Sequence, residues 1–207
     1  MGKILLINGS PHEFGCTYTA LKELADTLNA NDIETELLFL GKRTVHDCSA
    51  CMACQSTGQC VFEDAVNDLS RHIDEYDGIV AGSPVYYGSA SGKLCSFLDR
   101  LFLICGNLMS GKLGAAVVSC RRGGATAAFD RLNKYFLMNN MIVVGSQYWN
   151  QVHGTVPKEV CRDEEGMQTM RSLGENMTWL LRCIKAGKQA GIHNPEYERV
   201  IKTNFIR

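Results

Sequence analysis

Four cysteines lie close together in the segment "DCSACMACQSTGQC". Cys48, Cys51, Cys54 and Cys60 follow the spacing C-x2-C-x2-C-x5-C, with Gly58 in the last gap. Three thiolates this close in sequence can surround a cubane, and the short loop brings back a fourth. Iron-sulfur clusters are commonly held by four thiolates in compact runs of this kind. The spacing therefore predicts a [4Fe-4S] cluster bound by these four side chains.

Other uses of these cysteines stay open. Zn²⁺ also accepts four thiolates, although structural zinc sites usually divide their cysteines between two separated pairs. A redox-active disulfide or a cysteine-bearing loop without metal would have the same sequence. The other six cysteines of the chain are scattered, and several stand among apolar residues, where cysteine behaves as a small hydrophobic side chain.

Composition excludes several classes of function. The chain has 207 residues and a formal net charge of -1, and its basic residues form no stripe. With so small a net charge, the protein has no overall electrostatic field that would attract nucleic acid or an acidic membrane. No apolar run reaches the roughly 18 residues of a membrane helix, and the N-terminus lacks a signal-like segment. We therefore expect a cytoplasmic protein that binds neither nucleic acid nor membrane.

Apolar runs alternate with helical patterns along the chain. Such strands, apolar throughout and separated by helices, indicate a parallel sheet covered on both faces. The expected strands are 3–8, 34–40, 78–82, 113–119 and 141–145, and the expected helices are 17–29, 63–73, 91–104, 125–138 and 164–185. In open sheets of this kind, ligands bind beyond the carboxyl ends of the strands. Three loops therefore matter, at residues 9–16, 83–91 and 119–125.

The first of these loops contains Ser10, His12, Cys16 and Thr17 at the start of a helix. Hydroxyls and backbone N–H groups at a helix N-terminus favour a phosphate. The segment is neither a Walker loop nor a G-x-G-x-x-G motif, because the glycine spacing and the Lys-Ser/Thr pair are missing. An ordinary capped strand-to-helix turn would look the same.

The other two loops suit a flat ring. Pro84 is followed by Tyr86, Tyr87 and Gly88, which offer aromatic faces and an approachable backbone to a heteroaromatic ligand. The loop "SCRRGGATAAF" is basic and rich in glycine, so it can lie over a ring and approach an anionic partner. Each loop alone is also compatible with a plain surface turn.

Together these segments show a resemblance to a known family. "LLINGSP" with Cys16-Thr17, "GSPVYYGSASGKLCSFLDR" and the cysteine run resemble the NADPH-dependent FMN reductase branch of the flavodoxin-like superfamily, especially its iron-sulfur flavoproteins. The resemblance implies a doubly wound five-stranded parallel sheet of order 2-1-3-4-5 that binds FMN without a covalent bond. It also implies one FMN-binding domain over residues 1–190, with a cysteine-rich loop at 46–62.

The resemblance also assigns the contacts with FMN. Residues of the first loop would hold the phosphate, those of the second would border the isoalloxazine, and those of the third would cover its other side. The implied residues are Ser10, His12, Cys16, Thr17, Pro84, Val85, Tyr86, Tyr87, Gly88, Ser119, Arg122, Gly123 and Gly124. No side chain is expected to perform acid–base catalysis.

The expected function is an FMN-dependent NAD(P)H oxidoreductase. The acceptor would be free flavin, a quinone, an azo or nitro compound, or a redox protein, and a four-cysteine cluster would pass electrons to it. The first alternative is an FMN and iron-sulfur electron carrier that works with ferredoxin and lacks a nicotinamide site. The second is a non-redox protein whose cysteine loop binds zinc and a partner. Relatives usually pair, so we expect a homodimer or homotetramer, with the tail at 191–207 near a subunit interface.

Overall fold

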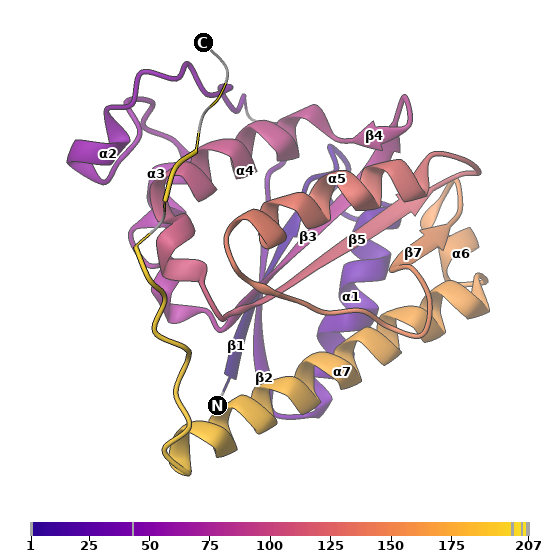
Figure 1. Cartoon of the computed structure of the whole chain (residues 1–207). Helices are drawn as coiled ribbons and strands as arrows, with labels where there is room; N and C mark the ends of the chain where they lie inside the picture. Colours follow the sequence, from indigo (N-terminus) through magenta and orange to yellow (C-terminus); the bar gives the residue numbers. More distant parts are fainter. Residues whose placement is uncertain (1, 43, 200, 204, 206–207) are drawn as a thin grey trace.

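The computed structural model describes residues 2–42, 44–199, 201–203 and 205. One sheet forms the centre of the molecule (Figure 1), and its main strands are all parallel and ordered β2-β1-β3-β5-β6. The strands are β1 (Gly2–Asn8), β2 (Ile33–Phe39), β3 (Gly78–Tyr86), β4 (Ser89–Ala90), β5 (Leu113–Cys120), β6 (Ile142–Val143) and β7 (Gln151–His153). Because β5 and β6 are the fourth and fifth expected strands, the predicted order is confirmed.

Helices cover both faces of the sheet, as the apolar strands require. The helices are α1 (Cys16–Ala30), α2 (Cys54–Thr57), α3 (Ala65–Ser70), α4 (Gly92–Cys105), α5 (Ala125–Met138), α6 (Pro157–Val160) and α7 (Glu164–Gln189). Two short 3₁₀ helices lie at Ile73–Glu75 and Gly106–Met109. One apolar core joins the sheet to α3, α4 and α5, and a second joins it to α1, α6 and α7. Figure 1 shows the two layers on opposite sides of the strands.

Strand β1 shows why the sheet is buried on both sides. Ile4 and Leu6 belong to the core under α1 and α7, whereas Leu5 and Ile7 belong to the core under α4 and α5. All four side chains are fully buried. Side chains alternate between the faces of a strand, so an apolar residue at every position is explained only by two covered faces.

The fifth strand differs from the prediction. A single strand over residues 141–145 was expected, but β6 contains two residues, and β7 pairs with β5 further along the same edge. Asn150 ends the connection between the two pieces. It is fully buried, its carbonyl oxygen accepts the Val118 N–H at 3.0 Å, and its side-chain amide donates to the Val144 carbonyl at 3.4 Å. The edge strand is therefore interrupted and resumed rather than continuous.

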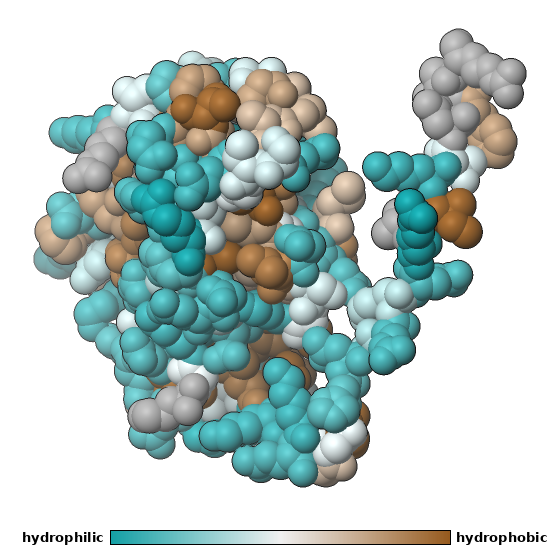
Figure 2. All heavy atoms as spheres, turned by 90° about the vertical axis from the view of Figure 1, so that its left-hand side faces the viewer, coloured by the Kyte–Doolittle hydropathy of each residue, from teal (hydrophilic) through white to brown (hydrophobic). Residues whose placement is uncertain are grey.

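The C-terminal helix and the tail behave differently. Met170, Leu173 and Met177 of α7 are fully buried, as the helical pattern predicted. Among the described tail residues, Ile192, Tyr197, Ile201 and Phe205 are exposed, and Figure 2 shows the segment after α7 standing off from the globular body. Residues 200, 204, 206 and 207 of the expected interface segment lie outside the described residues. No helix within the described ranges is both long and apolar enough to cross a bilayer.

Close approach of α5 to β5 gives a test of the packing. A Cβ on Gly114 would lie 2.6 Å from Cγ of Phe136, which is fully buried, so Gly114→Ala must push the ring and α5 outward. We expect the free energy of unfolding to fall by about 1–3 kcal/mol, as for other overpacked cores. Denaturant unfolding measures this change.

Gly92→Ala is the matched control, because a Cβ there meets nothing within 4 Å. Gly92 opens α4, and alanine is the better helix former, so this substitution should leave stability unchanged or slightly higher. Equal losses in the two variants would contradict the tight contact at Gly114.

Candidate functional site

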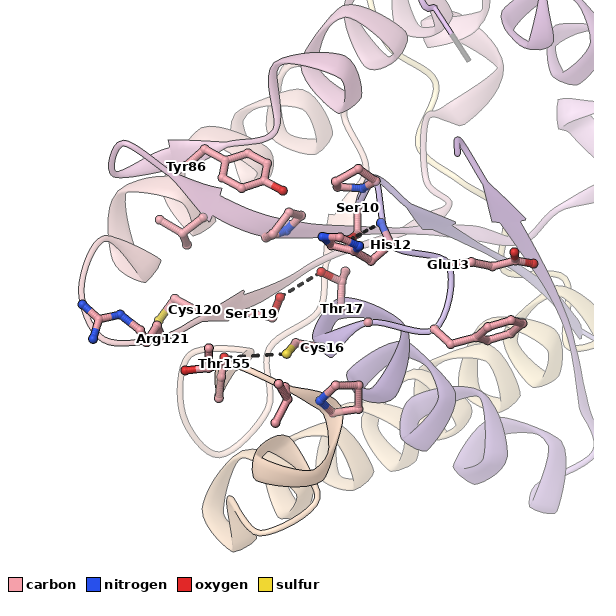
Figure 3. A pocket seen from close by; sticks show the side chains of 18 of the residues that line it. Ser10, His12, Glu13, Cys16, Thr17, Tyr86, Ser119, Cys120, Arg121 and Thr155 are labelled. Atoms are coloured by element: carbon pink, nitrogen blue, oxygen red, sulfur yellow. Dashed lines mark hydrogen bonds between the residues drawn. The ribbon is translucent and has the colours of Figure 1, made fainter. Parts of the chain in front are cut away.

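The carboxyl ends of β2, β3 and β5 and the segments that follow β1, β2, β5 and β7 surround a cavity of about 870 Å³ at the carboxyl edge of the sheet (Figure 3). This position is where ligands bind in doubly wound sheets, and the volume suits a cofactor-sized molecule. The lining residues are Ser10, Pro11, His12, Glu13, Phe14, Gly15, Cys16, Thr17, Phe39, Lys42, Pro84, Val85, Tyr86, Ser119, Cys120, Arg121, Gly154, Thr155, Val156 and Pro157.

The loop after β1 is held by its own polar side chains. Asn8 is fully buried; its Oδ1 accepts the Ser10 N–H at 3.1 Å, and its Nδ2 donates to the Glu13 carbonyl at 3.2 Å. The Oγ of Ser10 accepts the His12 N–H at 3.1 Å. These bonds fix the loop as it enters α1, and no described residue accepts a hydrogen bond from the Ser10 hydroxyl, which can therefore donate to a ligand.

The N-terminus of α1 opens toward this cavity. Gly15 is the N-cap residue, and among the described side chains none caps it. Gly15, Cys16 and Thr17 all line the cavity. The first N–H groups of a helix need acceptors, and together they carry a partial positive charge. An anion in the cavity would supply what the side chains do not, so the residues present fit a phosphate group.

Two contacts join the start of α1 to the other loops. Thr17 Oγ1 and Ser119 Oγ lie 2.8 Å apart in a hydrogen bond, and both residues are buried. The Cys16 thiol donates to the Gly154 carbonyl at 3.6 Å, and burial raises its pKa. Figure 3 shows both contacts on the floor of the site. The loops after β1, β5 and β7 therefore form one connected surface.

A tight hairpin follows β3. Val85 pairs with Ala90 and Tyr86 with Ser89, so Tyr87 and Gly88 form a two-residue turn. Both have positive φ, 50° for Tyr87 and 72° for Gly88, which is the geometry of a type I′ turn. Glycine adopts this conformation freely, whereas tyrosine is strained by about 1–2 kcal/mol. The Tyr87 ring is fully exposed, so burial of the ring does not offset this strain in the isolated chain.

The glycine-rich loop touches this hairpin. Gly124 has a φ of 90°, and a Cβ there would lie 2.8 Å from the Gly88 Cα and 3.0 Å from Val85 Cγ1. The loops after β3 and β5 therefore pack directly on one another, backbone to backbone. A side chain at position 124 would force them apart.

Most of the implied FMN contacts meet at this cavity. Of the thirteen implied residues, eight line the cavity, namely Ser10, His12, Cys16, Thr17, Pro84, Val85, Tyr86 and Ser119. The other five continue its loops beyond the lining, in the hairpin turn (Tyr87 and Gly88) and before α5 (Arg122, Gly123 and Gly124).

Part of the lining was not predicted from the sequence. Phe39 is the last residue of β2 and Lys42 lies shortly after it, and Gly154–Pro157 follow β7. Strand β7 has only three residues, so no strand pattern in the sequence pointed to the loop after it. Cys120 and Arg121 lie between expected residues, and their place in the basic loop was the available signal.

The four clustered cysteines surround a second, smaller cavity. Cys48, Cys51, Cys54 and Cys60 line it together with Arg100, Leu103 and Ile104 of α4. Within this loop Ala50 and Met52 have positive φ values of 53° and 59°. Left-handed conformations are unfavourable for these residue types and persist only where the surroundings impose them. Ala50 lies between Cys48 and Cys51, and Met52 lies between Cys51 and Cys54, so both bends fall between cysteines that line the cavity.

The spacing of the thiols bears on which group they could hold. No three His, Cys, Asp or Glu side chains in the described ranges converge closely enough to hold a single ion. Four thiolates on one Zn²⁺ would each lie about 2.3 Å from it, and so close to one another. Thiolates around a cubane bind four different irons and stand further apart. Four thiols around a shared cavity are the donor set of an iron-sulfur cluster, so the residues present fit that group.

Local contacts shift the pKa values of two of these thiols in opposite directions. The backbone N–H of Ala53 and the Ser49 hydroxyl lower the pKa of Cys51, which favours its thiolate. Burial raises the pKa of Cys54, and the neighbouring Cys60, Cys48 and Cys51 add to the increase. All ten cysteines are free thiols in this structure.

The sheet order and the cavity at its carboxyl edge define a flavodoxin-like α/β protein. The NADPH-dependent FMN reductase family matches residues 2–155, and the chain belongs to that family.

Individual relatives agree with this membership. An iron-sulfur flavoprotein of Methanocaldococcus jannaschii is 32% identical over 191 residues, covering 88% of this chain and 99% of that protein. An iron-sulfur flavoprotein of Methanosarcina thermophila is 26% identical over 190 residues, covering 90% and 98%. Among solved structures, RosB with bound 8-demethyl-8-formylriboflavin-5'-phosphate matches with a TM-score of 0.72 at 15% identity, covering 99% of this chain and 92% of that one. That last likeness concerns the fold.

The hydroxyl pair at the floor of the cavity gives a stability test. Thr17→Val removes one hydroxyl and leaves Ser119 without its buried partner, so we expect a loss of about 1–3 kcal/mol in the free energy of unfolding. Thermal or denaturant unfolding without added ligand measures it.

Ser119→Ala combined with Thr17→Val removes both groups. The double variant should lose less than the sum of the two single variants, because no polar atom is then left unpaired. Additive losses would contradict the pairing of Thr17 with Ser119.

Proposed function

We propose that the protein is an FMN-dependent NAD(P)H oxidoreductase that delivers electrons through a four-cysteine iron-sulfur cluster. The observation that carries this proposal is the cavity at the carboxyl edge. On one side of it lies a helix N-terminus that no described side chain caps, and on the other lies a proline-aromatic hairpin. Family membership and relatives named iron-sulfur flavoproteins support it.

In this proposal the parts of the site have distinct tasks. Ser10, Thr17 and the N-terminus of α1 bind the FMN phosphate. Pro84 to Gly88 border the ring, and Ser119 with the loop Arg122–Gly124 covers its other side. The four cysteines hold a [4Fe-4S] cluster. When bound, FMN accepts a hydride, which is two electrons and a proton, from NAD(P)H, and a cluster carries the electrons onward one at a time.

The side chains of this chain bind and position; they do not act as acids or bases in the hydride step. Buried Asn8 and the bond from Thr17 to Ser119 keep the phosphate loop fixed. Tyr86 lies on the cavity wall and the exposed Tyr87 beside it, where their rings can exclude water from a bound flavin and a nicotinamide. Orientation and water exclusion are what the protein adds to the chemistry of the cofactor.

We further propose that residues 1–190 act as one FMN-binding domain and that the tail contacts a second subunit in a homodimer or homotetramer. Support comes from the exposed apolar side chains of the described tail, such as Tyr197 and Phe205. The segment after α7 stands off from the globular body (Figure 2). Exposed apolar groups gathered on one segment are typical of contact surfaces.

Phosphate recognition can be tested with Ser10. Apo-protein should bind FMN more tightly than riboflavin, which lacks the phosphate. Ser10→Ala removes one donor to that phosphate, so FMN affinity should fall roughly tenfold or more, since hydrogen bonds to charged groups contribute about 1.5–3 kcal/mol. Quenching of flavin fluorescence measures both dissociation constants.

Riboflavin is the internal control for this variant. Its affinity should be nearly the same for the wild type and Ser10→Ala, because the ring contacts are unchanged. Equal losses for FMN and riboflavin would place the phosphate elsewhere or show that the loop has collapsed.

The nicotinamide step has a direct test. Anaerobic mixing of the FMN-loaded protein with NADPH or NADH in a stopped-flow spectrometer should bleach the flavin absorbance rapidly. Failure of both coenzymes, with dithionite still bleaching the same sample, would instead favour the carrier that works with ferredoxin. Protein that binds no FMN would contradict both forms of the proposal.

A further inference from the structure

Arg100 is an arginine buried beneath the cysteine loop. It lies on α4, and only 1% of its surface is exposed. Replacing a buried ion pair by apolar residues of the same shape often costs a protein no stability. Packing alone therefore does not explain why a charged guanidinium is buried at this position. Arg100 lines the small cavity together with the four cysteines.

Its guanidinium is fully engaged. Nε donates to the Cys60 sulfur at 3.2 Å. Nη1 donates to Asp64 Oδ2 at 2.6 Å and to the His46 carbonyl at 3.4 Å, and Nη2 donates to Asp64 Oδ1 at 3.0 Å and to the Phe62 carbonyl at 3.0 Å. Arginine has five N–H donors, and each finds an acceptor here.

These acceptors come from both ends of the cysteine loop. His46 precedes Cys48, whereas Cys60, Phe62 and Asp64 follow the third cysteine. The rings of His46 and Phe62 stack with centroids 4.3 Å apart, and the guanidinium lies 5.4 Å from the Phe62 ring centre. One side chain of α4 therefore joins the start of the loop to its end and shields the bond to sulfur from water.

We propose that Arg100 holds Cys60 in its cluster-binding position and raises the reduction potential of the cluster through the N–H···S bond. This inference rests on the proposed function, because it assumes that the four cysteines hold a cluster. Reduction adds one electron, and thus one negative charge, to the cluster and its sulfur ligands. An N–H donor and a positive charge next to Cys60 stabilise the reduced form more than the oxidised form, and hydrogen bonds to sulfur are a recognised determinant of cluster potentials.

Asp64 opposes this effect and holds the arginine in place. Its carboxylate pairs with both Nη atoms and also caps α3 by accepting the Val66 N–H at 3.0 Å. Because Arg100 is buried and the Asp64 side chain is only 18% exposed, solvent screens their charges less than it would at the surface. The two residues therefore predict potential shifts of opposite sign, which a purely structural role would not produce.

The test uses anaerobically prepared full-length protein and a redox titration of the cluster followed by electron paramagnetic resonance. Arg100→Gln should shift the midpoint potential to a more negative value, because it removes the charge and the donor to sulfur. Asp64→Asn should shift it to a more positive value. Asparagine still caps a helix, so α3 should remain intact in that variant.

Arg71→Gln is the matched control. Arg71 pairs with Glu63 at 3.2 Å and with Asp68 at 2.6 Å, and its side chain is half exposed. This variant removes the same charge close to the loop but no bond to sulfur, so its potential should equal that of the wild type. A shift as large as that of Arg100→Gln would overturn the proposal, since a general charge effect would then explain both.

The outcomes separate the inference from the proposed function. If the wild-type protein contains no iron and no acid-labile sulfide, it holds no cluster. That result would contradict both the proposed function and the role of Arg100. Loaded wild type with no shift in either variant, or with shifts of the same sign, overturns only the role of Arg100. The resonance signal reports loaded molecules alone, so a variant with reduced iron content still gives its potential. If Arg100→Gln holds no cluster at all, Asp64→Asn decides: a positive shift supports the proposal, and an unchanged potential overturns it.

Discussion

Every parallel strand of this sheet must end at the same edge, and that constraint creates the site. Strands β1, β3 and β5 are buried on both faces. Because these strands are parallel, the loops that leave their carboxyl ends all lie at the same edge of the sheet and close to one another. The backbone of α1 begins at that edge with no described side chain to cap it. A hollow with the positive end of a helix at its side therefore follows from the topology. The side chains that line it set its detailed chemistry.

Helix α4 links this hollow to the cysteine loop (Figure 1). It starts directly after the β3–β4 hairpin, where the Ser91 N–H donates to Ser83 Oγ at 2.8 Å, and Lys93 reaches the Gly41 carbonyl at 2.5 Å. About two turns later, Arg100 binds Cys60. One helix therefore has contacts near the large cavity, with the Gly41 carbonyl, and at the cysteine loop, with Cys60.

Much of this arrangement could be predicted from the sequence, because it depends on local patterns. Runs such as Leu5–Ile7 and Leu113–Val118 identify buried strands, and the loops after them follow from topology. Strand β7 has one buried side chain in three residues, so it carries no pattern, and the lining after it was missed. The bond between Arg100 and Cys60 joins positions 40 residues apart, and no local pattern encodes such a contact.

The interrupted edge strand also affects how the molecule meets others of its kind. A long, regular outer strand offers unpaired backbone groups to any passing strand and so invites uncontrolled aggregation. On the β5 side, the edge consists of two short pieces, β6 and β7, separated by the bend at Val144–Asn150. Another strand therefore cannot form a continuous ladder of hydrogen bonds along this edge. The opposite border, β2, is unbroken for seven residues but carries Glu34 and Glu36. Each edge of the sheet therefore has its own feature that opposes edge-to-edge aggregation with other molecules.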